Sequence, residues 1–149
     1  MRKLSVIVLT LSLSLLLGAT ARAEGDWLTS WDEAAKQSKK SGKPILIDFT
    51  GSDWCGWCIK LKKEVFDTPE FAAWAKKNVV LLEIDFPQSK PQSAELKKQN
   101  AALSEKYGIE GYPTILFVNA KGDVLGQYGY DQGGPSVWTK NAEKMLKKK

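Results

Sequence analysis

The sequence predicts an α/β domain with a central, mostly parallel mixed sheet, an antiparallel hairpin at one edge of the sheet, and helices on both faces. Three observations predict this class. Short apolar runs rich in Ile, Leu and Val recur along the chain, and helical patterns separate the first three of them, which favours parallel pairing. The last two runs are joined by a tight polar turn, which indicates a hairpin. A length of 149 residues is typical of one domain.

The N-terminal segment, residues 1–23, predicts a cleavable secretory signal peptide that is not part of this domain. It starts with two basic residues, continues with an apolar run broken only by Ser and Thr, and ends in the small-residue cleavage signal Ala21-Arg22-Ala23. The apolar run is shorter than the about 20 residues that cross a bilayer, and an uncleaved membrane anchor is the alternative. We therefore expect cleavage after Ala23, one domain over residues 24–149, and a periplasmic or secreted protein.

Helix caps and apolar runs place the elements of this domain. Ser30 and Glu33 form a capping box that begins the first helix, and Gly42 ends it. Thr68 before Pro69 marks another helix start, with Thr as the N-cap and Pro at the first position. The remaining elements are a buried strand over residues 45–49, a helix over about 55–66 before the one at Thr68, a strand over 79–86, a helix over 93–107, strands over 114–118 and 124–128, and a last helix from Gly133.

Apolar positions also predict the buried sides. The strand over 79–86 is nearly continuous in apolar character, which indicates helices on both of its faces. Helical spacing predicts inward-facing side chains in the last two helices: Leu96, Leu103 and Tyr107 in one, and Val137, Trp138, Ala142 and Met145 in the other.

Composition excludes several classes of site. The chain has no histidine, which excludes a Ser-His-Asp triad, a Cys-His hydrolase and a histidine-ligated metal site. Three of the 22 basic residues lie in the predicted signal peptide, and the basic residues of the remainder are all lysines. Scattered lysines without arginine do not predict a nucleic-acid partner. No phosphate-binding glycine loop is present, so no metal, flavin or nucleotide cofactor is implied.

Chemistry is concentrated in the segment Cys55-Gly56-Trp57-Cys58. Two cysteines separated by two residues, directly after a buried strand and at the start of a helix, form a redox pair by their spacing and context. Cys55 at the helix N-terminus meets free N–H groups and the positive end of the helix dipole, which stabilise a thiolate. Cys58 lies one turn deeper. We therefore expect Cys55 to be the attacking nucleophile and Cys58 to resolve the mixed disulfide.

Two cysteines at this spacing have other possible uses. A purely structural disulfide is one, although so short a loop restrains the unfolded chain little. A zinc site is another, but zinc normally takes four ligands, and this chain offers two thiols and no imidazole. Covalent haem attachment is excluded, because it requires a histidine after the second cysteine, where this chain has Ile59.

The stretch Ile45–Lys60, read together with Gly111-Tyr112-Pro113-Thr114, resembles the thioredoxin superfamily. It is most similar to exported thioredoxin-like and thiol:disulfide interchange domains, and the resemblance covers most of the chain after the signal peptide. It implies a thioredoxin fold in which Pro113 is cis and lies beside Cys55. A cis bond costs little before proline, although an ordinary trans turn is the alternative. The backbone of Tyr112 is then expected to pair with an extended substrate chain.

Asp48 resembles the buried acid below the active site of thioredoxins, which helps to take a proton from the second cysteine. A carboxylate within an apolar strand is unusual, and burial is expected to raise its pKa. Six residues separate Asp48 from Cys55, one more than thioredoxins usually have. The alternative is therefore an Asp48 that faces a polar gap or water.

The pair Gly56-Trp57 differs from the Gly-Pro of thioredoxins and lacks the histidine that isomerases and strong oxidants carry next to the second cysteine. That histidine would stabilise the Cys55 thiolate, and Asp53 disfavours it further. We therefore expect only a moderately lowered pKa for Cys55, and hence a mild oxidant or a reductant. Trp54 and Trp57 are expected to form an apolar rim that captures unfolded chains, unless one of them packs against the sheet instead.

These residues predict an exported thiol-disulfide oxidoreductase, a protein-disulfide reductase or isomerase rather than a strong oxidase. We expect it to be a monomer that acts on disulfide-containing proteins and exchanges electrons with a redox partner such as a membrane thiol reductant. The alternative is a non-catalytic binding module of the same fold with an inert Cys55–Cys58 disulfide. Cys58→Ala separates the two, because only the oxidoreductase would trap mixed disulfides with its substrates.

Overall fold

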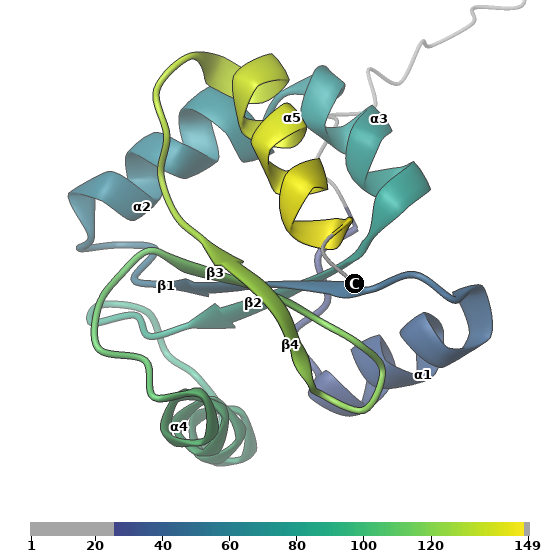
Figure 1. Ribbon diagram of the computed structural model, residues 1–149. Coiled ribbons are helices and arrows are strands. Elements are labelled where there is room, and N and C mark those ends of the chain that lie inside the picture. Colours follow the sequence, from purple (N-terminus) through teal and green to yellow (C-terminus); the bar gives the residue numbers. More distant parts are fainter. Residues whose placement is uncertain (1–25, 148–149) are drawn as a thin grey trace, which may run out of the picture.

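The computed structural model describes residues 26–147, in which a four-stranded sheet lies between two layers of helices (Figure 1). The predicted signal peptide, residues 1–23, lies outside the described residues. Within residues 26–147 no helix is both long enough and apolar enough to cross a membrane. In chain order the elements are α1 (Trp31–Ser41), β1 (Ile45–Thr50), α2 (Gly56–Leu61), the π-helix η1 (Lys62–Phe66), α3 (Pro69–Asn78), β2 (Val80–Asp85), α4 (Ala94–Tyr107), β3 (Thr114–Val118), β4 (Val124–Tyr128) and α5 (Gly134–Leu146).

The sheet has the strand order β2-β1-β3-β4, and it is mixed as predicted. It contains less parallel pairing than expected, because β1 pairs in parallel with β2 alone and the other two pairs are antiparallel. The path of α4 explains the difference. Figure 1 shows this helix end-on while the strands run across the view, so α4 crosses the strands instead of returning along them. The chain therefore re-enters the sheet at the end where β2 stopped, and Thr114 pairs with Phe49.

Helices cover both faces of the sheet, which confirms the predicted class. Figure 1 shows α2, α3 and α5 on one side of the strands and α1 and α4 on the other. Strand side chains alternate between two cores accordingly. Leu46 and Ile115 face the first group of helices with Phe66, Phe71 and Trp138. The second core lies on the opposite face and contains Ala34, Ile45, Ile47, Phe49, Leu82, Ile84, Leu103, Leu116 and Val118.

The predicted helix caps are present. The Ser30 hydroxyl accepts a hydrogen bond from the Glu33 N–H at 3.4 Å, and α1 ends at Gly42, whose φ of 72° requires the left-handed region that glycine adopts freely. The Thr68 hydroxyl accepts from the Phe71 N–H at 3.2 Å and caps α3. Local polar chemistry therefore sets the ends of these helices, as the sequence indicated.

Three side chains or segments differ from expectation. The helix predicted over 55–66 is α2 followed by the π-helix η1. Val137 is exposed, because the larger Trp138 takes the sheet-facing position of α5 and Val137 lies against Gly133. Asn100 of α4 is buried although no pattern predicted it, and its amide donates to the Asp85 carbonyl at 2.9 Å. A buried amide in a helix is tolerated only where such a partner exists.

Candidate active site

The two cysteines lie at the start of α2, after the turn that follows β1. They are joined by a disulfide, with their Cα atoms 5.2 Å apart. Cys55 is the N-cap of α2, and its sulfur accepts a hydrogen bond from the Cys58 N–H at 3.2 Å. Cys55 is 7% exposed and Cys58 is 4% exposed, so the expected difference in depth is small in this oxidised pair. The Cys58 N–H belongs to the first turn of the helix and has no backbone acceptor within it. Its hydrogen bond to the Cys55 sulfur stabilises negative charge on that sulfur.

Asp48 lies inside the domain on the α2 side of β1. It is 6% exposed, and within residues 26–147 its Oδ1 atom has no hydrogen-bond partner. Loss of hydration raises the pKa of Asp48 well above its usual value, and the nearby charge of Glu83 raises it further, while the charge of Lys62 acts in the opposite direction. A buried carboxyl of this kind holds a proton up to a higher pH than a solvated one.

Glu83 is a second acid on this face that the sequence analysis missed. The parallel register sets Glu83 of β2 beside Asp48 of β1, and registered neighbours in a sheet point to the same side. Partial burial raises the pKa of Glu83 as well, with a smaller contribution from Asp85. A glutamate inside the apolar run of residues 79–86 was the signal that could have revealed it.

Trp54 precedes Cys55 in the chain and is 41% exposed. Its indole N–H donates to the Phe86 carbonyl at 2.7 Å, and its ring meets Tyr112 edge-on at 5.7 Å between centroids. Gly51 makes this placement possible, because a Cβ at that position would lie 2.4 Å from the Trp54 ring. The Tyr112–Pro113 peptide bond is cis, the isomer that the family resemblance implies.

Trp57 lies between the two cysteines in the chain and is 56% exposed. Its ring lies 5.1 Å from that of Tyr130, and the Lys60 ammonium sits 5.2 Å from both ring centroids. The Tyr130 hydroxyl donates to Glu64 at 2.7 Å, so the β4–α5 connection is held against α2 and η1. The sequence analysis predicted Trp57 at the site but neither Tyr130 nor Glu64. Tyr130 is distant from Trp57 in the sequence, and Glu64 belongs to no motif.

Asp53 fixes a loop at the rim of the site. Its two carboxylate oxygens accept from the N–H groups of Gln88 and Ser89 at 2.9 and 2.7 Å. These hydrogen bonds lower the pKa of Asp53. They also offset part of its negative charge, so the repulsion of a Cys55 thiolate is weaker than the sequence alone suggested. Ser52 ties the same turn to β2 through two hydrogen bonds to the Asp85 carboxylate, at 2.9 and 2.6 Å.

Chemically, this arrangement is a dithiol–disulfide couple with a buried carboxyl group, Asp48, and two exposed tryptophans, Trp54 and Trp57. Within residues 26–147 no group of three or more His, Cys, Asp or Glu side chains is placed to hold a metal ion.

Comparison with known proteins gives the same class. Residues 31–133 match the model of the thioredoxin-like domain family, and the chain belongs to this family. It is 36% identical over 127 residues to the disulfide bond reductase DsbH of Chlamydia pneumoniae, which covers 85% of this chain and 76% of DsbH. It is 33% identical over 138 residues to the thioredoxin-related protein DsbJ of the same organism, but this covers 89% of the chain and only 40% of DsbJ.

A solved structure of a DsbH oxidoreductase superposes with a TM-score of 0.80 at 32% identity, covering 97% of this chain and 96% of that one. Together with the Cys55–Cys58 pair, these similarities make the chain a thiol-disulfide oxidoreductase of the thioredoxin fold. The predicted superfamily, fold class and reaction type are confirmed. Such an enzyme requires a disulfide substrate and a redox partner.

Proposed function

We propose that this chain is a reductase of disulfide bonds in exported proteins. The observation that carries the proposal is a Cys55–Cys58 disulfide at the N-terminus of α2, in a chain without histidine. Without an imidazolium beside the pair, the thiolate of the reduced form lacks the main cation that makes such pairs strong oxidants. Similarity to a relative named disulfide bond reductase supports the same direction.

The reaction starts from the reduced pair. The Cys55 thiolate attacks one sulfur of a substrate disulfide, a Cys55–substrate disulfide forms, and the other substrate sulfur leaves as a thiolate that takes up a proton. Cys58 then loses its proton and attacks the Cys55 sulfur. The substrate's second sulfur leaves and is protonated, and the Cys55–Cys58 disulfide remains. Two electrons and two protons have moved to the substrate, and a dithiol partner returns the enzyme to its reduced form.

Asp48 is the proposed acceptor of the Cys58 proton. It lies on the face of β1 that α2 covers, it is buried, and its Oδ1 atom is free of partners within the described residues. A raised pKa suits this task, because a carboxylate takes a proton from a thiol best when the two pKa values are close. Of the six residues between Asp48 and Cys55, four (51–54) lie in the turn between β1 and α2.

The proposed substrate-binding surface is the set of residues around the Cys55–Cys58 pair. Trp54 and Trp57 offer apolar walls, and Gly56 between them leaves open space, since a Cβ there would meet nothing within 4 Å. The backbone of Tyr112, before the cis Pro113, is the proposed edge for an extended substrate chain. Apolar and backbone contacts of this kind depend little on the amino-acid sequence of the substrate, which suits a reductase that acts on many proteins.

We further propose that the chain acts as a monomer in a bacterial periplasm or outside the cell, after cleavage at Ala23, and that a membrane thiol reductant supplies its electrons. The signal-peptide pattern supports the location, and the similarity to Dsb proteins supports a dedicated redox partner. No nucleic acid or bound cofactor takes part in this scheme.

The reduction potential of the Cys55–Cys58 couple tests the direction. The protein is equilibrated in glutathione buffers, free thiols are trapped by alkylation, and the mass shift is read. A value at or below about −250 mV, close to thioredoxin, supports the reductase. A value near about −180 mV or higher would show an isomerase or oxidase instead.

Cys58→Ala tests the mechanism. It is expected to accumulate mixed disulfides through Cys55 on non-reducing gels, and the matched variant Cys55→Ala is expected to accumulate far fewer. A binding module with an inert disulfide would trap no substrate in either variant. It would also keep its affinity for client proteins when both cysteines are replaced by serine.

A further inference from the structure

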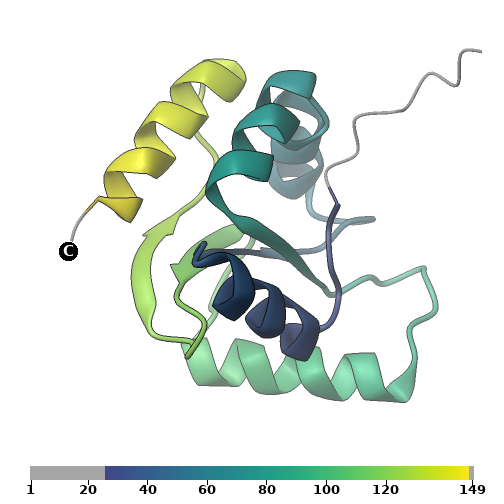
Figure 2. The same cartoon turned by 90° about the vertical axis from the view of Figure 1, so that its right-hand side faces the viewer.

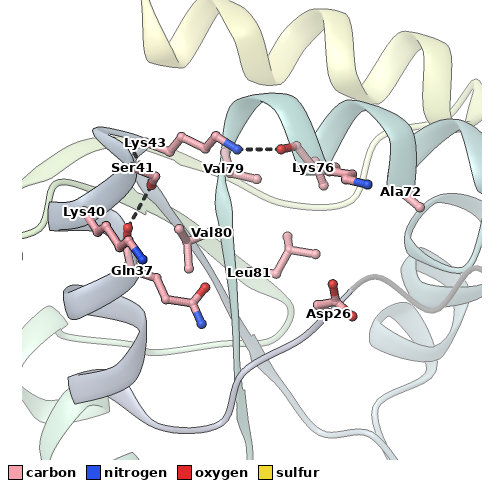
Figure 3. A pocket seen from close by; sticks show the side chains of 11 residues that line it. Asp26, Gln37, Lys40, Ser41, Lys43, Ala72, Lys76, Val79, Val80 and Leu81 are labelled. Atoms are coloured by element: carbon pink, nitrogen blue, oxygen red, sulfur yellow. Dashed lines mark hydrogen bonds between the residues drawn. The ribbon is translucent and has the colours of Figure 1, made fainter.

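A groove of about 720 Å³ lies at the free edge of β2, at the opposite end of the sheet from the cysteines. Its walls are turns of α1 and α3, which lie on opposite faces of the sheet (Figure 2). Figure 3 shows the side chains of both helices that line it. Its floor is formed by Val79 and by the first two residues of β2, Val80 and Leu81. The volume falls within the range of ligand-binding clefts.

The floor presents backbone groups to the groove. The Val80 N–H donates to Pro44 on the β1 side, while the Leu81 carbonyl accepts from Leu28 on the opposite side. Backbone groups alternate along a strand, so the Val79 carbonyl and the Leu81 N–H also point away from β1. Leu28 makes the bridge that occupies the other part of this edge, with its carbonyl bound to the Glu83 N–H at 2.8 Å.

Trp27, the residue before the Leu28 bridge, packs on one face of the sheet. Its ring packs against Phe66 and Phe71, with centroids 5.2 and 6.3 Å away, on the α3 side of the sheet. Among the described residues, Asp26 lines the groove without pairing to β2. Within residues 26–147 no strand pairs with the Val79 carbonyl or the Leu81 N–H, and both residues line the groove.

The polar rim of the groove is mainly basic. Lys40 of α1 and Lys76 of α3 stand on its two sides, and neither makes an ion pair within residues 26–147. Lys43 crosses from the α1–β1 connection to the last turn of α3, where its ammonium donates to the Lys76 carbonyl at 2.6 Å and bounds one end of the groove (Figure 3). Asp26 is the one acidic side chain of the lining.

We propose that this groove binds an extended, acidic segment of a partner protein, which adds to the edge of β2 as a further strand. The Val79 carbonyl and the Leu81 N–H would supply the backbone hydrogen bonds, and the apolar floor would take alternate side chains. Lys40 and Lys76 would meet carboxylates of the segment. The site is separate from the redox pair, because Val79 and Leu81 lie at the start of β2, and Cys55 follows the end of β1, its parallel neighbour.

The test uses a blocked six-residue peptide of alternating glutamate and valine, titrated into the isotope-labelled protein and followed by amide NMR. We expect saturable shifts that centre on Leu81 and its neighbours and leave Cys55 unchanged. A peptide of the same sequence with N-methylated backbone amides is expected to lose binding, because it cannot donate to the edge. A lysine–valine peptide is expected to lose it because of its charge.

Variants of the rim complete the test. The double charge reversal Lys40→Glu and Lys76→Glu is expected to weaken peptide binding about tenfold, because two attractions become repulsions. The matched reversal of two exposed lysines of α4, Lys97→Glu and Lys98→Glu, is expected to leave binding within about twofold. Both variants should keep the wild-type rate of thiol-disulfide exchange. Peptide binding is measured separately from that rate, so failure of this proposal and failure of the proposed function are distinguishable.

Three results would overturn the proposal. The first is the absence of saturable binding. The second is a set of shifts that centre on Trp54 and Trp57, which would identify the peptide as a ligand of the redox rim. The third is peptide-independent shifts at Leu81 that grow with protein concentration, which would show that a second copy of this chain pairs at the edge.

Discussion

Gly51→Ala is the substitution with the most direct predicted effect on the site. A Cβ at position 51 would lie 2.4 to 2.7 Å from three atoms of the Trp54 indole, well inside van der Waals contact. The backbone at Gly51 does not need the left-handed region, so the whole effect comes from this clash. The ring of Trp54 must therefore leave its position beside the disulfide.

The contacts that would be lost set the magnitude. The indole hydrogen bond to the Phe86 carbonyl, at 2.7 Å, contributes about 0.5–1.5 kcal/mol. The edge-on contact with Tyr112, at 5.7 Å, contributes about 0.5–1.5 kcal/mol beyond its buried area. We therefore expect Gly51→Ala to lower the free energy of unfolding by about 1–3 kcal/mol, which is also the usual cost of overpacking.

Urea unfolding of the oxidised protein measures this change, with Gly111→Ala as the matched control. A Cβ at Gly111 would meet nothing within 4 Å, and its backbone φ is not positive, so the control is expected to stay within about 0.5 kcal/mol of wild type. If Gly51→Ala were equally neutral and left the tryptophan fluorescence unchanged, Trp54 would not occupy the position described above. Loss of the wall should also raise the KM for protein disulfides more than it lowers kcat.

Three further predictions concern charged groups of the site. Burial raises the pKa of Asp48, so its carboxyl favours the fold below about pH 4 and this stability is lost as the pH rises through the raised pKa. Asp48→Asn is therefore expected to gain stability over wild type between pH 4 and neutral pH, and equal differences at pH 3.5 and 7.5 in urea unfolding would contradict this. The pKa of Asp53 is lowered, so its contribution to the free energy of unfolding is present above about pH 4 and is lost on acidification through the lowered pKa. Asp53→Asn should therefore reduce the loss of stability on acidification. An unchanged loss in this variant would show that the Asp53 carboxylate does not stabilise the fold. Lys60→Gln removes the ammonium above Trp57 and is expected to cost about 0.5–1 kcal/mol and to change the Trp57 fluorescence, whereas Lys63→Gln should do neither.

The proposed strand-addition groove and the redox pair lie at opposite ends of the sheet. The pair follows the C-terminal end of β1, and the groove lies at the start of β2. A partner held at the groove would leave the aromatic rim of Trp54 and Trp57 open to a disulfide substrate. This separation allows the two proposals to be tested independently, by redox assays at one end and by peptide binding at the other.

Local signals in the sequence determined most of the elements and the centre of the site. Polar caps at Ser30 and Thr68 fixed helix starts, because the first N–H groups of a helix need an acceptor nearby in sequence. The position of Cys55 at the start of a helix, and its spacing from Cys58, followed in the same way from a few adjacent residues. These features depend on contacts within one turn of the chain, which a sequence pattern records directly.

Only the tertiary structure decided which elements meet. The register of β1 and β2 sets Glu83 beside Asp48, and the path of the β4–α5 connection brings Tyr130 to Trp57. The crossing direction of α4 made β3 antiparallel where parallel pairing was expected. Each of these contacts joins residues far apart in the chain, so it depends on loop paths and on the packing of both cores, and neither periodicity nor motif spacing carries that information.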